Sequence, residues 1–577
     1  MLYPIQNPYR QVVDLSGLWA FKPDPSAQGE RKNWVTGLPD PRPIAVPASW
    51  NDQFTDLRDF LGPAWYQTRF DLPWHWEHQP IFIRFNSVNY QTAVWLNGVH
   101  LGGHEGGHLP FKYEITDHVT SRDNLLVVRV DGRLDANHVP PGNIIGSDLD
   151  FFPSHSENNP QTQFDFFPFC GIQRPVLIYT QPRIAIEDIT VITDLVGDQG
   201  VISVNIKPAD IPVIGTLTGD GTSIQTEGVG ELSFEIPHVK TWSPSSPFLY
   251  DLTISQMNGN TITDAYTLSV GVRTVSIEDD HLLLNGQPIY LQGFGRHEDF
   301  PISGRGLNLP VIIKDYDLMH WIGANSFRTS HYPYSEQMMT LADQMGFLVI
   351  DETPAVGLYF NKDGYDKRLA LCRQYVQDLI MRDKNHPSVI AWSLANEPIS
   401  LRDSAKPFFQ DLNNLARSLD PTRPITLVSC MGILEESFEF LDFMCLNRYF
   451  GWYQESGQID RGTEMLSAEL DMLYDTYHKP ILLAEFGADA IPGQHAQPPE
   501  MFTEEYQAEL ITRYIDVLRS KPYIIGEHVW NMCDFKTAQG ITRMGGINYK
   551  GVFTRDRRPK MAAHRLRKIW REESKQK

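Results

Sequence analysis

The chain has 577 residues and a formal net charge of −21 at pH 7, and its composition, 41% hydrophobic and 21% charged residues, is that of an ordinary folded enzyme. Its length exceeds what one hydrophobic core usually serves, so the sequence predicts several domains. The strong negative charge disfavours nucleic acid or an anionic membrane surface as a partner. An acidic substrate would therefore need its own local cluster of positive side chains.

The five cysteines are odd in number and widely spaced, without a CxxC pair or a Cys/His pattern typical of metal sites (Cys170, Cys372, Cys430, Cys445 and Cys533). We therefore expect reduced thiols in the core, no bound metal and no cofactor. The segment from Met1 to Pro8 lacks the basic and apolar regions of a signal peptide, and no apolar run has transmembrane length. The sequence predicts a cytoplasmic protein.

The first 274 residues contain short strand patterns broken by turns. In residues 1–181, Asn97-Gly98 predicts a tight hairpin and 125–130 a strand, which together favour a β-sandwich. In residues 182–274, strand patterns at 189–192, 201–206 and 266–270 favour a second sandwich of the immunoglobulin-like type.

In residues 275–577 the pattern of predicted elements changes from strands alone to alternating strands and helices. After a second hairpin signal at Asn285-Gly286, strands and helices alternate to the end, with strands predicted at 289–294, 326–329, 347–350, 389–394, 425–428, 443–446, 481–484 and 524–528. Helices are predicted, for example, at 311–322, 335–345, 366–382 and 503–519, with Gly346 ending the second. Eight alternations predict a (β/α)8 TIM barrel. The alternative, a doubly wound sheet, would need a Gly-rich phosphate loop after an early strand, and the sequence has none.

Two glutamates carry the chemistry of this region. Glu397 ends the apolar run of the fourth predicted strand and Glu485 that of the seventh, so both would face the C-terminal mouth of the barrel. A carboxylate at the end of a buried strand is costly, and two of them suggest the acid/base and nucleophile of a glycoside hydrolase. The plainer interpretation is that each glutamate forms a buried ion pair with a barrel Arg or Lys.

A retaining glycosidase holds its two carboxyl groups roughly 5–5.5 Å apart. Asn396 directly precedes Glu397 and is placed to bind a sugar hydroxyl beside the scissile bond. We therefore predict Glu397 as the acid/base and Glu485 as the nucleophile. An inactive carbohydrate-binding protein stays open as an alternative, and metal-dependent hydrolysis ranks last because no HExxH pattern is present.

The segment Ser393-Leu394-Ala395-Asn396-Glu397-Pro398 resembles glycoside hydrolase family 2. Further segments resemble the same family, at 293–299, 328–334, 351–353 and 242–250. The resemblance implies the order of a jelly-roll-like, sugar-binding-like sandwich (1–181), an immunoglobulin-like sandwich (182–274) and a catalytic barrel (275–577). It also implies a homo-oligomer, a dimer or a tetramer.

Within that family, Asn548-Tyr549-Lys550 resembles the Asn-x-Lys motif with which β-glucuronidases hold the sugar carboxylate. Arg543 would approach the same carboxylate, although the segment between it and Asn548 is one residue longer than usual. The resemblance implies sugar-binding roles for six more residues, with Tyr449 also bonded to Glu485 (Asp165, His331, Asn447, Tyr449, Tyr453 and Trp530). The expected substrates are small-molecule or oligosaccharide β-glucuronides, and a β-galacturonidase, β-galactosidase or β-mannosidase stays open.

Two expectations follow from these motifs. A neutral sugar would leave Lys550 unpaired, and Lys550→Ala would reduce glucuronide activity while the fold stays intact. The connection from Thr353 to about Asp366 is short for an enzyme that covers small aglycones with a long loop there. We therefore hypothesise that the acceptor side is open to bulky or oligosaccharide aglycones.

Overall fold

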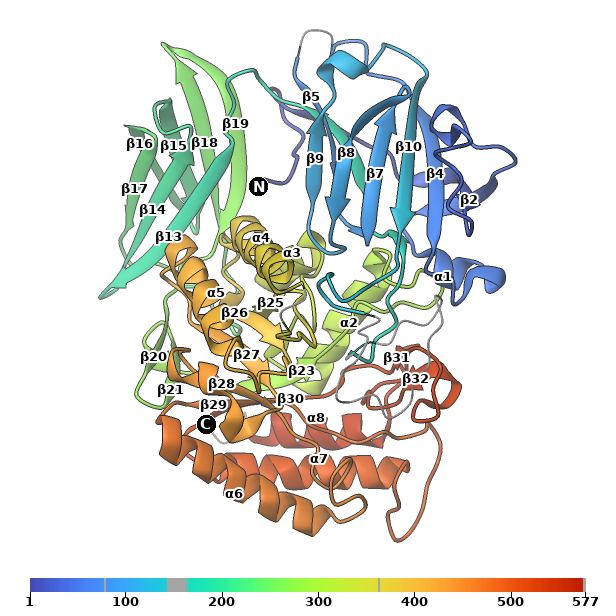
Figure 1. The fold of residues 1–577 in the computed structure, drawn as a ribbon. Helices are drawn as coiled ribbons and strands as arrows, with labels where there is room; N and C mark the ends of the chain where they lie inside the picture. Colours follow the sequence, from blue (N-terminus) through green and yellow to red (C-terminus); the bar gives the residue numbers. More distant parts are fainter. Residues whose placement is uncertain (77–78, 143–161, 163, 362–363, 574–577) are drawn as a thin grey trace.

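The computed structural model describes residues 1–76, 79–142, 162, 164–361 and 364–573. Two β-sandwiches stand side by side above a barrel (Figure 1). This architecture confirms the predicted fold class of two β-sandwiches followed by a TIM barrel. We propose domain boundaries at 181/182, between strands β12 and β13, and at 274/275, between β19 and β20.

The first sandwich packs a four-stranded sheet on a six-stranded sheet. The first sheet has the order β1-β12-β5-β9 (Gln11–Asp14, Val176–Thr180, Ile81–Phe85, Phe111–Glu114). The second has the order β3-β2-β4-β10-β7-β8 (Arg42–Val46, Gly17–Pro23, Pro63–Phe70, Asn124–Asp131, Gln91–Leu96, Val99–Glu105). Asn97 and Gly98 join β7 to β8 with φ angles of 51° and 83°, so the predicted hairpin is confirmed.

Buried and exposed residues alternate along the strands of the second sandwich, and this alternation is why its strands could be predicted from the sequence. In β14, for example, Ile202, Val204 and Ile206 are buried and their neighbours face outward. One sheet has the order β13-β14-β17 (Asp188–Val196, Gln199–Lys207, Glu231–Ile236). The other has the order β16-β15-β18-β19 (Thr222–Val229, Pro212–Gly219, Tyr250–Asn258, Thr261–Val270).

Eight parallel strands close the barrel, each within a few residues of its predicted position. They are β23 to β30 (Leu291–Gly295, Ser326–Arg328, Leu348–Glu352, Val389–Asn396, Ile425–Ser429, Met444–Asn447, Ile481–Glu485 and Ile524–Val529). The hairpin β20-β21-β22 (Val275–Glu278, His281–Leu284, Gln287–Pro288) covers the barrel bottom, where Leu282 and Leu284 pack against Leu291 and Leu348. The opposite, C-terminal end is therefore the mouth.

Seven α-helices of the described residues surround the barrel, α2 to α8 (Leu309–Ile322, Glu336–Met345, Tyr365–Asp383, Ala405–Leu419, Ile459–Tyr477, Glu504–Arg519, Met561–Glu573). Ser335 caps α3 through the N–H of Met338, and Gly346 ends it with φ 75°. The fifth connection departs from strict alternation. Between β27 and β28 the chain forms two 3-10 helices, Gly432–Leu434 and Glu436–Glu439, in place of an α-helix.

All five cysteines lie in the described part of the chain as free thiols, four of them buried. Among the described residues, no helix is long and apolar enough to cross a membrane.

Candidate active site

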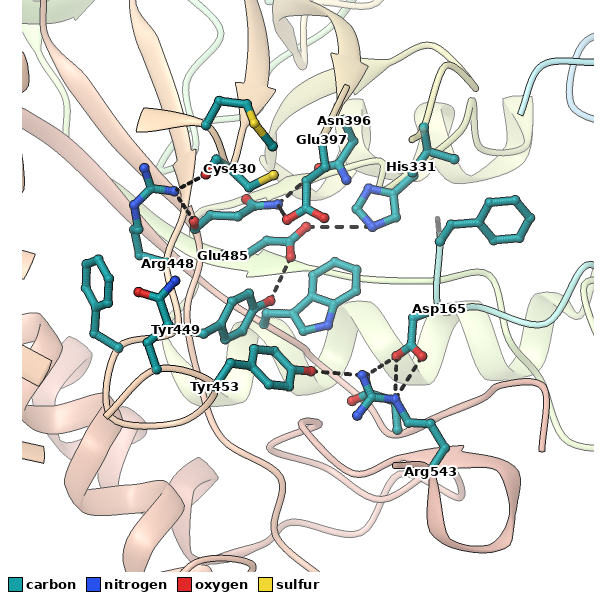
Figure 2. Close-up of a pocket in the computed structure, with 18 of the residues that line it drawn as sticks. Asp165, His331, Asn396, Glu397, Cys430, Arg448, Tyr449, Tyr453, Glu485 and Arg543 are labelled. Carbon is teal, nitrogen blue, oxygen red and sulfur yellow. Dashed lines mark hydrogen bonds and ion pairs between the residues drawn. The ribbon is translucent and has the colours of Figure 1, made fainter. Parts of the chain in front are cut away.

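A pocket of about 430 Å³ opens at the barrel mouth, and Glu397 and Glu485 point into it from two neighbouring sides (Figure 2). Nine of the ten predicted substrate-binding residues line it as well (Asp165, His331, Asn396, Asn447, Tyr449, Tyr453, Trp530, Arg543 and Asn548). Lys550 is the exception, because it lies behind Tyr453 and is only 1% exposed.

Glu485 is the last residue of β29 and is held by two strong donors. Arg328 donates to its Oε1 at 2.5 Å, and the hydroxyl of Tyr449 donates to its Oε2 at 2.7 Å, as the family resemblance implied. The Nε2 atom of His331 lies 3.6 Å from Oε1. These contacts fix the carboxylate against the barrel wall and favour its ionised form.

Glu397 directly follows β26 and adopts a left-handed backbone conformation with φ 45°. This conformation is uncommon for a residue other than glycine, and it is typical of positions where a side chain must be aimed. Its Oε1 accepts one hydrogen bond, from the Nδ2 of Asn447 at 2.8 Å. Among the residues that the structure describes, Glu397 therefore has one neutral donor, whereas Glu485 has a charged donor and a phenol.

The two carboxyl groups compete for protons. Burial raises the pKa of Glu485 to about 8, since the opposing effects of Arg328 and Tyr449 are smaller and the charge of Glu397 adds to the rise. Burial also raises the pKa of Glu397, against the hydrogen bond from Asn447. Two neighbouring anions are therefore disfavoured, and the pair retains one proton near neutral pH.

Arg328 organises the wall behind the nucleophile candidate and was not among the predicted site residues. It is fully buried, and besides Glu485 it donates to the Oε1 of Glu352 at 2.7 Å and to the Oδ1 of Asn396 at 3.3 Å. Glu352 in turn accepts from the hydroxyl of Ser393 at 2.8 Å. One guanidinium thus balances two buried carboxylates, which is what keeps both in place.

Trp530 and His331 form a flat surface on the pocket floor. Their rings stack with centroids 5.0 Å apart, and burial, followed by the charge of Arg328, holds the pKa of His331 well below its usual range. The imidazole is therefore neutral. Behind Trp530, a Cβ at Gly295 would meet the ring carbon Cε3 at 2.5 Å, so only glycine admits the indole there.

At the far end of the pocket from Glu397, charged side chains gather (Figure 2). The Nε of Arg543 donates to both oxygens of Asp165 at 2.8 and 2.9 Å, and its Nη2 donates to the hydroxyl of Tyr453 at 2.8 Å. Asn548 donates to Asp165 at 2.6 Å. The longer segment before Asn548 therefore does not remove Arg543 from the pocket.

Asp165 reaches this end because the chain of the first sandwich pairs with the barrel mouth. Phe166 forms an antiparallel bridge with Thr537, and the N–H of Phe167 donates to the carbonyl of Lys536 at 2.9 Å. Lys536 belongs to β31 (Phe535–Lys536), which pairs with β32 (Ile547–Asn548). The contact joins segments that lie about 370 residues apart in the sequence.

Lys550 is already paired within the protein, so the expectation that a neutral sugar would leave it unpaired is wrong. Its Nζ donates to the Oδ2 of Asp489 at 2.5 Å and to the hydroxyl of Tyr453 at 2.8 Å. Asp489 is itself buried, and burial raises its pKa less than Lys550 and Arg543 lower it. Asp489 follows β29, so the ammonium has a partner within the protein whether or not a carboxylate enters the pocket.

Three family models together match almost the whole chain. Residues 12–182 match the sugar binding domain of glycosyl hydrolases family 2, residues 184–273 match the model named simply for that family, and residues 275–574 match its TIM barrel domain. The chain belongs to glycosyl hydrolase family 2.

Curated relatives of this family 2 chain include a β-glucuronidase from Paenibacillus borealis, which is 42% identical, with 99% of each chain covered. A β-glucuronidase from Rattus norvegicus is 39% identical, with 99% of this chain and 92% of the relative covered. Similar solved structures include β-D-glucuronidase from Dictyoglomus thermophilum (40% identity, 99% and 98% covered, TM-score 0.91). Another is the Ruminococcus gnavus β-glucuronidase in complex with D-glucuronic acid (37% identity, 99% of each chain covered, TM-score 0.93).

Several residues of this family 2 pocket were missed from the sequence. Arg328 lies behind the pocket wall, and eight residues that line the pocket were not singled out by the motifs (Phe164, Val356, Cys430, Met431, Arg448, Phe450, Gln454 and Glu469). Arg328 and Glu352 end barrel strands as Glu485 does, so the signal that selected the two glutamates applied to them equally. Among the described residues, no group of His, Cys, Asp or Glu side chains is arranged to hold a metal ion.

Proposed function

We propose that this chain is a retaining exo-β-glucuronidase, which hydrolyses β-D-glucuronides to glucuronic acid and an alcohol. The observation that carries the proposal is a glutamate pair at one end of a pocket whose other end holds Arg543, Asn548 and, through Tyr453, Lys550. The similarity to β-glucuronidases over 99% of this chain supports it.

The first step uses the unequal settings of the two glutamates. We assign the shared proton to Glu397. Once Glu397 is protonated, its charge no longer raises the pKa of Glu485, and the donors Arg328 and Tyr449 stabilise Glu485 as the anion. Glu485 attacks the anomeric carbon, the glycosidic C–O bond breaks, and Glu397 gives its proton to the leaving oxygen. The product is a glucuronyl ester on Glu485 and a free alcohol.

The second step reverses the proton transfer. Once Glu485 is esterified its charge is gone, so the repulsion on Glu397 falls and that group becomes a base. Glu397 takes a proton from water, the water oxygen attacks the anomeric carbon, and the ester bond to Glu485 breaks. Two inversions at one carbon give net retention.

The remaining predicted residues hold the sugar in this proposal. Trp530 packs against the pyranose ring, and five polar residues bind its hydroxyls (Asp165, His331, Asn396, Asn447 and Tyr453). Arg543, Asn548 and Lys550 recognise the carboxylate, with Asp489 and Asp165 as their resting counter-ions.

Initial rates on p-nitrophenyl β-D-glucuronide, β-D-galacturonide, β-D-glucoside and β-D-galactoside test this function. We expect the glucuronide to be turned over with a kcat/KM at least about 10²-fold above the neutral sugars, since a charged pair of hydrogen bonds distinguishes them. Higher activity on a neutral sugar would overturn the carboxylate assignment, and higher activity on the galacturonide would identify the C4 epimer as the substrate.

Cytoplasmic location and assembly as a dimer or tetramer stay part of the proposal. The five free thiols support a reducing compartment. Light scattering of the purified chain tests the oligomeric state.

A further inference from the structure

Arg328 is a buried cation that is shared by two carboxylates. Its Nη1 donates to the Oε1 of Glu352 at 2.7 Å, and its Nη2 donates to the Oε1 of Glu485 at 2.5 Å. Burial lowers the pKa of Arg328, but the charges of Glu352 and Glu485 raise it by more. The guanidinium therefore stays charged, and among the described residues these two glutamates are its ion-pair partners.

The proposed reaction removes the charge of one of these partners. When Glu485 attacks the anomeric carbon, the new C–O bond turns its carboxylate into a neutral ester, the glycosidic C–O bond breaks, and Glu397 protonates the leaving oxygen. Until water hydrolyses the ester, Arg328 cannot use Glu485 as a counter-ion. A buried charge without a counter-ion is strongly destabilising, so the ester needs a second carboxylate beside Arg328.

Glu352 is held in place independently of the substrate. It is the last residue of β25 and is fully buried, so a sugar in the pocket does not reach it. Its Oε2 accepts from the hydroxyl of Ser393 in β26 at 2.8 Å, and its N–H donates to the hydroxyl of Thr329, directly after β24, at 2.8 Å. Three neighbouring strands of the barrel therefore fix this carboxylate beside Arg328.

The other polar neighbours of Arg328 do not carry the charge that is needed. The Nδ1 of His331 lies 3.2 Å from the Nη1 of Arg328, but burial, followed by the charge of Arg328, holds the pKa of His331 well below its usual range. Asn396 accepts from Nη1 at 3.3 Å with an uncharged amide. Glu352 is therefore the carboxylate that remains when Glu485 is esterified.

Loss of the charge on Glu485 also strengthens the remaining pair. Burial raises the pKa of Glu352, and the charge of Arg328 opposes that rise. Once Arg328 is no longer shared, its full charge acts on Glu352 and favours the ionised form. The ion pair thus changes from one cation with two carboxylates to one cation with one.

We propose that Glu352 is a positioning residue that serves as the counter-ion of Arg328 while Glu485 is an ester, and thereby stabilises the glycosyl-enzyme intermediate. The inference rests on the proposed function and deepens it. It assigns a task in the second half of the reaction to a carboxylate that does not touch the sugar.

A thermal unfolding cycle tests the exchange without any substrate. Glu485→Gln replaces the carboxylate by a neutral group of the same shape, as the ester does, and Glu352→Gln removes the second counter-ion. Each single variant leaves Arg328 one glutamate, whereas the double variant leaves it none. We expect the Tm of the double variant to fall roughly 5 °C further than the sum of the two single shifts. Additive shifts would overturn the proposal.

Two control variants show whether an unpaired cation is the cause. Arg328→Met added to the double variant removes the buried charge and should recover most of the additional loss, and this triple variant decides the question if the double variant cannot be obtained folded. Glu527→Gln removes another fully buried barrel carboxylate, which pairs with Arg519 at 2.8 Å. Combined with Glu485→Gln it should give additive shifts. Failure of Arg328→Met to recover stability would contradict the proposal.

Trapping the ester tests the same exchange in the working enzyme. 2-Deoxy-2-fluoro-β-D-glucuronyl fluoride forms a long-lived ester on Glu485 as its fluoride leaves, and mass spectrometry counts the label. Labelling should lower the Tm of Glu352→Gln by roughly 5 °C but not that of the unmodified chain or of Glu527→Gln. The rate constant for labelling should be roughly tenfold lower in Glu352→Gln than in the other two.

The two experiments fail in different ways. If Glu352→Gln is labelled at the rate of the unmodified chain and keeps its Tm, the proposed counter-ion role is wrong. If the unmodified chain takes no label, the proposed function itself fails. The unfolding cycle still decides in that case whether Glu352 can replace Glu485 as the partner of Arg328.

Discussion

Glu397 and Glu485 have the same side chain, so the different roles that we propose for them must come from their neighbours. Glu485 has a guanidinium and a phenol as donors, whereas Glu397 has one amide. Glu485→Gln should therefore lower turnover of every glucuronide by more than about 10⁴-fold, because nothing else attacks the anomeric carbon.

Glu397→Gln should depend on the leaving group. We expect kcat/KM to fall about 10²–10⁴-fold for methyl β-D-glucuronide, whose alcohol needs protonation, and much less for the p-nitrophenyl substrate. Azide should restore turnover of the p-nitrophenyl substrate by this variant, since it needs no base to attack the ester. Equal losses on both substrates would contradict the acid/base role.

The pH profile reports on the same pair. The active form holds one proton, so kcat/KM should fall at alkaline pH, where Glu397 loses it, and at acid pH, where Glu485 is protonated as well. Arg328 lowers the pKa of Glu485, so Arg328→Gln should move the acid limb to higher pH. Arg328→Lys keeps the charge and is the control, and a matching shift in that variant would contradict the electrostatic explanation.

The burial of Lys550 changes what its removal should do. Lys550→Ala leaves Asp489 as a buried anion whose remaining partners among the described residues are the N–H of Tyr549 at 2.8 Å and Arg543 at 3.9 Å. Breaking a buried pair in this way typically costs about 3–5 kcal/mol, so we expect loss of folding stability as well as of glucuronide activity. Urea denaturation of Lys550→Ala beside Lys550→Ala/Asp489→Asn checks this, because the double variant should regain most of the stability but not the activity.

The direction in which pH changes the stability difference between Lys550→Ala and the unmodified chain follows from the pKa of Asp489. In the unmodified chain its lowered pKa contributes stability above the ordinary value of 3.8, which is lost as the pH falls through the folded pKa. Without Lys550, burial raises the pKa instead. The stability difference between Lys550→Ala and the unmodified chain should therefore shrink at acid pH. A constant difference would contradict an electrostatic cause.

At the scale of the elements, the barrel strands could be located from the sequence because each is a short apolar run between turn signals. The predicted strand ends were less accurate than the strand positions. The strands β25 and β26 each continue two residues past their predicted ends, into Asp351-Glu352 and Ala395-Asn396. Those extra residues carry the polar groups of the mouth. A charged residue at a strand end can be recognised in the sequence, so Arg328 could have been found in this way. The partner of a charged residue cannot be recognised, and so the sequence did not indicate Asp489 as the counter-ion of Lys550.

One glycine links strand packing to the site. At Gly295, the last residue of β23, an added Cβ would lie 2.5 Å from Trp530. Gly295→Ala should displace the indole and cost roughly 1–3 kcal/mol of stability together with glucuronide affinity. Thermal unfolding and KM measure both effects. Gly540→Ala, where a Cβ meets nothing within 4 Å, is the control, and equal effects at both positions would contradict the packing argument.

At the scale of the whole molecule, the domains meet at the mouth. The first sandwich supplies Asp165 through its pairing with β31, a contact that no local pattern predicts. The net charge of −21 would repel an anionic sugar at long range, and the two cations at this end of the pocket, Arg543 and Lys550, already have the counter-ions Asp165 and Asp489. The proposed recognition of the sugar carboxylate therefore depends on short-range hydrogen bonds rather than on an excess of positive charge.

The central claim is that this pocket hydrolyses β-glucuronides through an ester on Glu485. Proton NMR during hydrolysis of p-nitrophenyl β-D-glucuronide tests it most directly, because the anomeric signal of the first product is read before mutarotation. The account predicts that β-D-glucuronic acid appears first and the α-anomer later. If the α-anomer appears first, hydrolysis proceeds with inversion and Glu485 is not the nucleophile.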